Sequence, residues 1–118
     1  MKKLFDLFEE MGYREAEGFF RQGSLTDKEY PKEFFTFWNI DTPEYSFYDN
    51  QSHRYVDIIQ VGFYTNDATK IYSVMDDFVE RAKQKDFVLR GKPKDADADQ
   101  PGYFGRVCVV QIINNTEE

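Results

Sequence analysis

The chain has 118 residues, and 15 Lys and Arg stand against 22 Asp and Glu, which gives a formal net charge of -7 at pH 7. This length suits one domain with a single core, and the acidic balance argues against gripping nucleic acid through phosphates, which needs clustered Lys and Arg. The single cysteine excludes an intramolecular disulfide and a cysteine-based zinc site, and no apolar run is long enough for a membrane helix, so no membrane partner is expected.

The chain is predicted to begin with a short helix. Apolar residues recur there at helical spacing, namely Leu4, Phe5, Leu7, Phe8 and Met11. This spacing predicts an amphipathic helix that ends at Gly12. A brief strand is predicted over residues 18–21, and the polar residues 24–32 are predicted to form a loop.

Residues 33–40 are aromatic and favour a strand. Alternation places Phe34, Thr36, Trp38 and Ile40 on one face, and Phe35, Phe37 and Asn39 on the other. Both faces are apolar, and aromatics make up 18% of the chain, so one face is expected to meet the core and the other a neighbour. The predicted oligomer or partner interface therefore consists of Phe34, Phe35, Phe37, Trp38 and Tyr64.

Residues 53–65 form the longest predicted strand, in which Gly62 marks a bulge or the close approach of another backbone. Asn66 and Asp67 offer a cap for the helix that follows. That helix shows one continuous apolar stripe, made of Ile71, Val74, Met75, Phe78, Val79 and Ala82.

The last third of the chain is predicted to contain a short strand over residues 86–90, a polar mobile loop over 92–102, a strand over 103–113 and a frayed tail over 114–118. No internal repeat is present, so residues 1–118 are predicted to form a single domain. The order of elements predicts an α+β fold. Its mixed, mostly antiparallel sheet is expected to have four to five strands, with two helices packed on one face.

Catalytic chemistry has little support in this sequence. The only histidine is His53, in a polar turn, and the only thiol is Cys108, in the middle of a predicted strand. A Cys–His pair is possible on paper, but a cysteine inside a strand is usually an inert small hydrophobe. We therefore expect no enzyme, no catalytic residue and no cofactor.

Asp95, Asp97 and Asp99 have the spacing that opens a calcium-binding loop. Such a loop also needs Gly at its sixth position and Glu at its twelfth, where this chain has Gln100 and Arg106. A solvated acidic loop is the simpler interpretation, and no metal is expected.

Several segments together carry a family resemblance. They are Phe20-Arg21-Gln22-Gly23-Ser24-Leu25, Tyr30-Pro31, Phe34-Phe35-Thr36-Phe37-Trp38-Asn39, Tyr48-Asp49-Asn50, Phe63-Tyr64-Thr65-Asn66-Asp67, and Gly105-Arg106 before an apolar strand. The chain resembles the tail-completion or tail-terminator proteins of long-tailed phages and prophages. The resemblance implies helices packed on a mixed sheet, and a typically hexameric ring that caps the tail tube and joins it to the head.

On this resemblance the expected function is non-enzymatic virion assembly. The expected partners are other copies of the chain, the tail-tube protein and the head-completion protein. Assembly would take place in the host cytoplasm, and the product would lie at the head-tail junction. The loop is expected to order on the tail tube through Lys94, Asp95, Asp97, Asp99, Tyr103 and Arg106. The alternative is a small intracellular adaptor or inhibitor that binds one protein through an aromatic sheet face.

Overall fold

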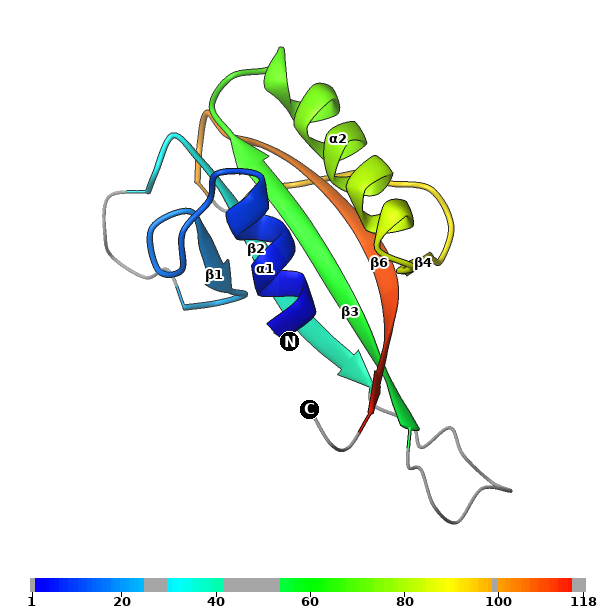
Figure 1. Cartoon of the computed structure of the whole chain (residues 1–118). Coiled ribbons are helices and arrows are strands. Elements are labelled where there is room, and N and C mark those ends of the chain that lie inside the picture. Colours follow the sequence, from blue (N-terminus) through cyan, green and yellow to red (C-terminus); the bar gives the residue numbers. More distant parts are fainter. Residues whose placement is uncertain (1, 25–29, 42–53, 99, 116–118) are drawn as a thin grey trace.

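The computed structural model describes residues 2–24, 30–41, 54–98 and 100–115 (Figure 1). Its elements in chain order are α1 (Lys2–Glu10), β1 (Phe19–Arg21), β2 (Glu33–Asp41), β3 (Arg54–Thr65), α2 (Lys70–Gln84), β4 (Val88–Leu89), β5 (Lys94–Ala96) and β6 (Phe104–Asn115). The predicted α+β class with a mixed, mostly antiparallel sheet is confirmed. The predicted count of four to five strands was too low, because the described residues form a sheet of six strands.

The strand order across the sheet is β1-β2-β3-β6-β4. β5 pairs with a different stretch of β6 from the one that β4 pairs with. Among the strands of the described residues, β1 and β2 run parallel, and the other pairs are antiparallel. The extra strand, β5, lies inside the segment that was predicted to be a loop. The final strand reaches Asn115, so the first two residues of the predicted tail belong to β6, and the rest of that tail lies outside the described residues.

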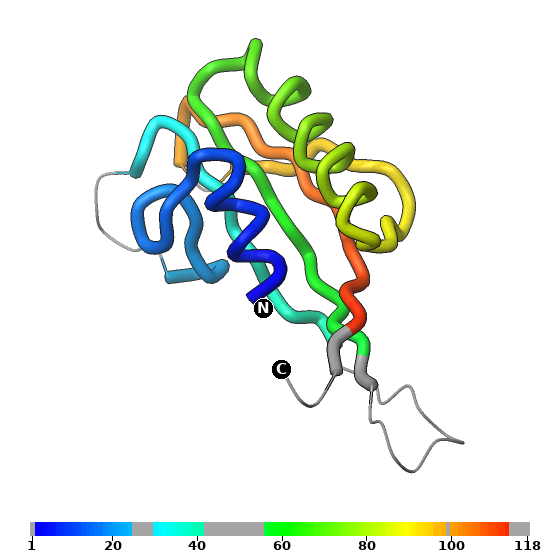
Figure 2. Tube along the Cα trace, in the orientation of Figure 1, coloured from blue at the N-terminus to red at the C-terminus, as the bar shows by residue number. Residues whose placement is uncertain are grey.

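Alternation along the strands divides the sheet into two faces. Ile59, Val61 and Phe63 of β3 are fully buried, and they share the helix-covered face with their cross-strand partners, among them Phe35, Cys108 and Val110. Both helices lie on this same face (Figures 1 and 2). The other face of the sheet, called here the open face, carries no helix formed by the described residues.

Aromatic rings join the two helices to the sheet. Phe8 of α1 stacks on Phe35 with ring centroids 4.7 Å apart, and Phe78 of α2 lies 5.8 Å from Phe8 and 5.6 Å from Phe35. Burying each such side chain contributes about 1.5–3 kcal/mol, so these three rings help to fix both helices on the sheet. At the surface, Arg81 of α2 and Lys85, which directly follows α2, each pair with Glu10 of α1 at 3.1 Å.

The two helices follow the predicted periodicities, but the start of α2 differs in detail. Asp67 does not cap the helix; its Oδ1 instead accepts hydrogen bonds from the backbone N–H (2.9 Å) and hydroxyl (2.7 Å) of Thr69, which is itself the cap residue. These bonds lower the pKa of Asp67. Neither helix is long and apolar enough to cross a bilayer, as judged on the described residues.

Candidate functional site

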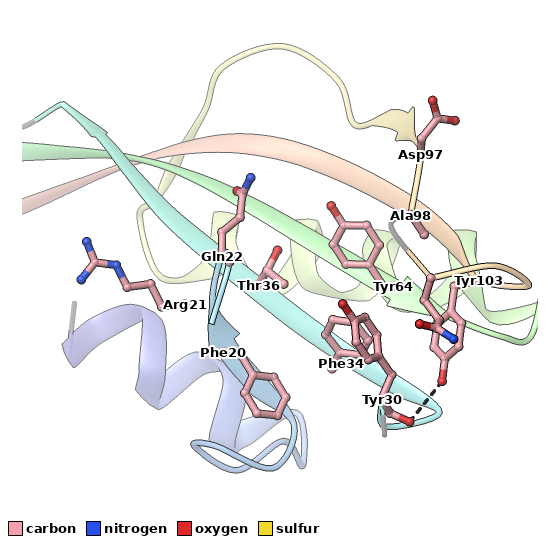
Figure 3. Close-up of a pocket in the computed structure, with 12 residues that line it drawn as sticks. Phe20, Arg21, Gln22, Tyr30, Phe34, Thr36, Tyr64, Asp97, Ala98 and Tyr103 are labelled. Carbon is pink, nitrogen blue, oxygen red and sulfur yellow. Dashed lines mark hydrogen bonds between the residues drawn. The ribbon is translucent and has the colours of Figure 1, made fainter. Parts of the chain in front are cut away.

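An aromatic cluster covers one end of the open face. Phe34 of β2 stacks on its cross-strand partner Tyr64 of β3, with centroids 5.6 Å apart and the rings inclined by 24°. Around Phe34 stand the rings of Phe20 (6.0 Å), Tyr30 (5.7 Å) and Tyr103 (6.3 Å) (Figure 3). These five residues come from β1, β2, β3 and two connecting segments, so the fold, rather than one local motif, assembles the cluster.

Two glycines let the Tyr64 ring lie close against the sheet. A Cβ at Gly105, the residue opposite Tyr64 on β6, would lie 2.6 Å from Tyr64 Cε1 and 2.8 Å from the carbonyl oxygen of Ala96. A Cβ at Gly62 would lie 2.9 Å from Tyr64 Cε2 and 2.9 Å from Thr36 Oγ1. Real Cβ atoms do not approach other atoms this closely, so glycine is required at Gly105 by the neighbouring backbone. At Gly62 the predicted close approach of another backbone is wrong, because the atoms nearest to a Cβ there belong to the side chains of Thr36 and Tyr64.

Tyr103 is linked by its hydroxyl group to the segment that carries Tyr30. Its hydroxyl lies 2.7 Å from the carbonyl oxygen of Pro31 and 3.2 Å from that of Tyr30, so it donates to this carbonyl pair (Figure 3 draws the Tyr30 bond). The bond joins two segments more than seventy residues apart in the sequence, and it holds the segment before β6 over the open face.

A pocket of about 170 Å³ lies among these rings. Besides the five aromatic residues, it is lined by Arg21, Gln22, Gly23, Thr36, Asp97, Ala98 and Gln100. Asp97 lies at the outer rim, and the Arg21 side chain points away from the rings (Figure 3). The guanidinium of Arg21 lies 5.8 Å from the Trp38 ring centroid.

Farther along the open face, apolar side chains reach solvent. Trp38 of β2 is 45% exposed, and Ile113 of β6 is 43% exposed. Val88 of the edge strand β4 is also exposed on this face. Directly paired residues share a face of the sheet: Val88 pairs with Gln111, and Gln111 pairs with Ile58, which alternates with the helix-facing Ile59. Trp38, Val88 and Ile113 are called here the open-face patch.

A second exposed apolar area lies on the helix side of the sheet. Tyr72 of α2 is 51% exposed and Phe104, the first residue of β6, is 46% exposed; both line one shallow hollow. These two residues are called the edge patch. Arg106 lies 4.8 Å from the Tyr72 ring centroid, and its Nη1 is 2.6 Å from Asp95 Oδ1, so β5 is tied to both β6 and α2.

The structure separates the five residues of the predicted interface. The prediction was wrong for Phe35, because this side chain of β2 is fully buried beneath the helices and presents no surface to a partner. Phe37 also lies on the helix face, against Phe5 at 5.0 Å. Phe34 is buried within the aromatic cluster and Tyr64 is half-buried there, which leaves Trp38 as the one exposed member of the five.

The residues of the predicted assembly loop also lie in different parts of the structure. Lys94 and Asp95 belong to β5, Tyr103 makes the bond to the Tyr30–Pro31 carbonyls, and Arg106 lies inside β6 facing α2. Asp97 lines the pocket, and Asp99 lies outside the described residues. Within the described ranges, no group of three or more His, Cys, Asp or Glu side chains could hold a metal ion.

Of the two residues considered for nucleophilic chemistry, only Cys108 is described; His53 lies outside the described residues. The Cys108 thiol is buried on the helix face of the sheet, and burial raises its pKa from 9.0 to about 12. The thiol therefore stays protonated near neutral pH, which is unfavourable for a nucleophile.

No protein-family model matches the chain, and no curated protein sequence matches it.

The edge patch and β5 were not predicted from the sequence. Tyr72 offered one signal, since it is an aromatic residue off the apolar stripe of its helix, a position that burial in the core does not explain.

Proposed function

We propose that this chain is a non-enzymatic assembly protein whose copies associate head to tail in a closed ring. The observation that carries the proposal is the pair of exposed apolar patches on opposite sides of the sheet. A ring requires two different surfaces on each subunit, one complementary to the other, whereas a symmetric dimer requires only one surface. In the proposed ring, the open-face patch of one copy packs against the edge patch of the next.

The family resemblance suggests where such a ring would act. We propose that it caps the tail tube of a long-tailed phage and joins the tail to the head, with the tail-tube and head-completion proteins as its neighbours. The net charge of -7 on each subunit supports this position. An acidic lining repels phosphates, so DNA passes without being held.

Charge substitutions in the two patches test the ring directly. Trp38→Glu should prevent one half of the contact and Phe104→Glu the other, so each variant alone should stay monomeric when measured by analytical ultracentrifugation. An equimolar mixture should form heterodimers and nothing larger, because each variant keeps one intact patch. Gln84→Glu adds the same charge at an exposed site on α2 and should leave the rings intact.

Other outcomes would contradict the ring. A wild-type chain that stays monomeric at high concentration, alone and with tail-tube protein, would favour the alternative of an adaptor that binds one partner. A dimer that Trp38→Glu abolishes and Phe104→Glu leaves unchanged would show a symmetric contact through the open face. For the virion role, electron micrographs of a phage lacking this gene should show unattached heads beside overlong tails.

A further inference from the structure

We propose that the pocket in the aromatic cluster binds a lysine or arginine side chain of a partner protein. The pocket shares Asp97, Ala98, Gln100 and Tyr103 with the hollow at the edge patch, but none of the residues of the two patches lines it, and it is complete within one subunit. It therefore does not depend on ring formation.

The size of the pocket restricts its ligand. Sites for cofactors and drug-sized ligands usually have volumes of about 300–1,000 Å³, and this pocket has about 170 Å³. A cavity of about 150 Å³ already holds a molecule the size of benzene. One amino-acid side chain is therefore a suitable occupant, and a nucleotide is not.

The lining favours a cation over an apolar group. Tyr30, Tyr64 and Tyr103 place three electron-rich rings around one space, and such rings attract an ammonium or guanidinium group that lies within about 6 Å of a ring centre. The carboxylate of Asp97 stands at the rim. Elsewhere in this fold the same chemistry is already in use, because Arg21 and Arg106 each lie over an aromatic ring.

Charge supports the same choice. The chain carries an excess of seven acidic groups, so its overall field attracts a basic partner surface. Among the described residues that line the pocket, the one basic residue is Arg21, and its side chain points away from the rings and toward Trp38. The alkyl stem of a lysine or arginine would pack on Phe20 and Phe34, while its charged end lies among the tyrosines.

The test is an NMR titration of the full chain at constant ionic strength, with the aromatic signals of Tyr30, Tyr64 and Tyr103 as the readout. The probes are the Nα-acetyl methylamides of lysine, arginine and norleucine; norleucine has the lysine stem without its charge. The two cationic probes should shift these signals with an affinity about fivefold higher than norleucine, the factor expected from one exposed cation–π contact. Equal binding of norleucine, or no shift of these signals by any probe, would overturn the proposal.

Variants locate the effect. Tyr64→Leu should abolish the preference for cations, and Asp97→Asn should weaken lysine binding without changing norleucine binding. Tyr72→Leu removes an exposed tyrosine outside the pocket and should change neither. Asp97 is exposed, so Asp97→Asn remains informative if Tyr64→Leu does not fold. If Asp97→Asn leaves lysine binding unchanged while Tyr72→Leu reduces it, the cation binds elsewhere and the proposal is wrong.

Discussion

Tyr64 shows how a single side chain depends on what its neighbours lack. Its ring occupies the space that side chains at Gly62 and Gly105 would fill, and at Gly105 the carbonyl of Ala96 closes that space from the other side. The ring in turn covers backbone that two glycines would otherwise leave bare. The position of Tyr64 in the aromatic cluster thus depends on the absence of side chains at Gly62 and Gly105.

Substituting these glycines should have unequal effects. Gly105→Ala should destabilise the fold by about 2 kcal/mol, since its new methyl group meets a backbone oxygen that cannot move without disturbing β5. Gly62→Ala should cost less, because it meets only side-chain atoms. Urea denaturation measures both, and adding Tyr64→Leu should rescue Gly62→Ala more fully than Gly105→Ala. Equal rescue of the two would contradict the role given to Ala96.

The buried thiol of Cys108 makes a separate prediction at this scale. Its pKa rises from 9.0 to about 12, which lowers the thiolate fraction about a thousandfold near pH 8. Iodoacetamide should therefore label the native chain far more slowly than the urea-unfolded chain. Because the folded pKa is the higher one, the thiol's contribution to stability is present below pH 9 and is lost as the pH rises toward 12. Cys108→Ala should remove that part of the alkaline slope.

Among the elements, those with strong periodicity could be predicted from the sequence and β5 could not. The stripe from Ile71 to Ala82 fixes both the existence and the buried face of α2, and alternation assigned Phe34 and Phe35 to opposite faces correctly. Lys94–Ala96 has no apolar alternation; it is a strand because β6 offers an edge to pair with. That information lies in the tertiary structure.

The candidate site was only partly predictable for the same reason. Alternation gives the face of a residue but not what covers that face, so Phe34 and Trp38 look equivalent in the sequence. In the structure Phe34 lies under Tyr30 and Tyr103, whereas Trp38 stays 45% exposed. The residues that make this difference are distant in the chain.

The link between the segment before β6 and the segment before β2 can be measured. Tyr103→Phe removes the hydroxyl that donates to the carbonyls of Tyr30 and Pro31 and should cost about 1 kcal/mol, with faster amide exchange at the start of β2. Tyr72→Phe is the matched control, because its hydroxyl lies 3.4 Å from the exposed Asp95 and should contribute almost nothing. Similar losses of folding stability in both variants would show that the Tyr103 hydroxyl does not make a special contribution through these carbonyls.

For the whole molecule, charge and apolar surface oppose each other in association. Each copy brings a net charge of -7, so subunits that approach through apolar patches must overcome repulsion. Raising the ionic strength screens that repulsion and leaves apolar contacts in place, so the proposed rings should become more stable with added NaCl. Sedimentation at several salt concentrations measures this. Rings that dissociate as salt increases would show that ion pairs hold them instead.

The short strands at the margins of the sheet bear on how this protein avoids the wrong kind of assembly. On the outer side of β6, β5 pairs with residues 105–107 and β4 with residues 110–111, and the N–H of Arg90 donates to the carbonyl of Val109. At the opposite margin, β1 is only three residues long. A long strand with unpaired amides is a template for fibril growth, and these short pieces interrupt it on both sides. Damage to β4 or β5 would then be seen first as precipitation during expression, before any measurable loss of folding stability.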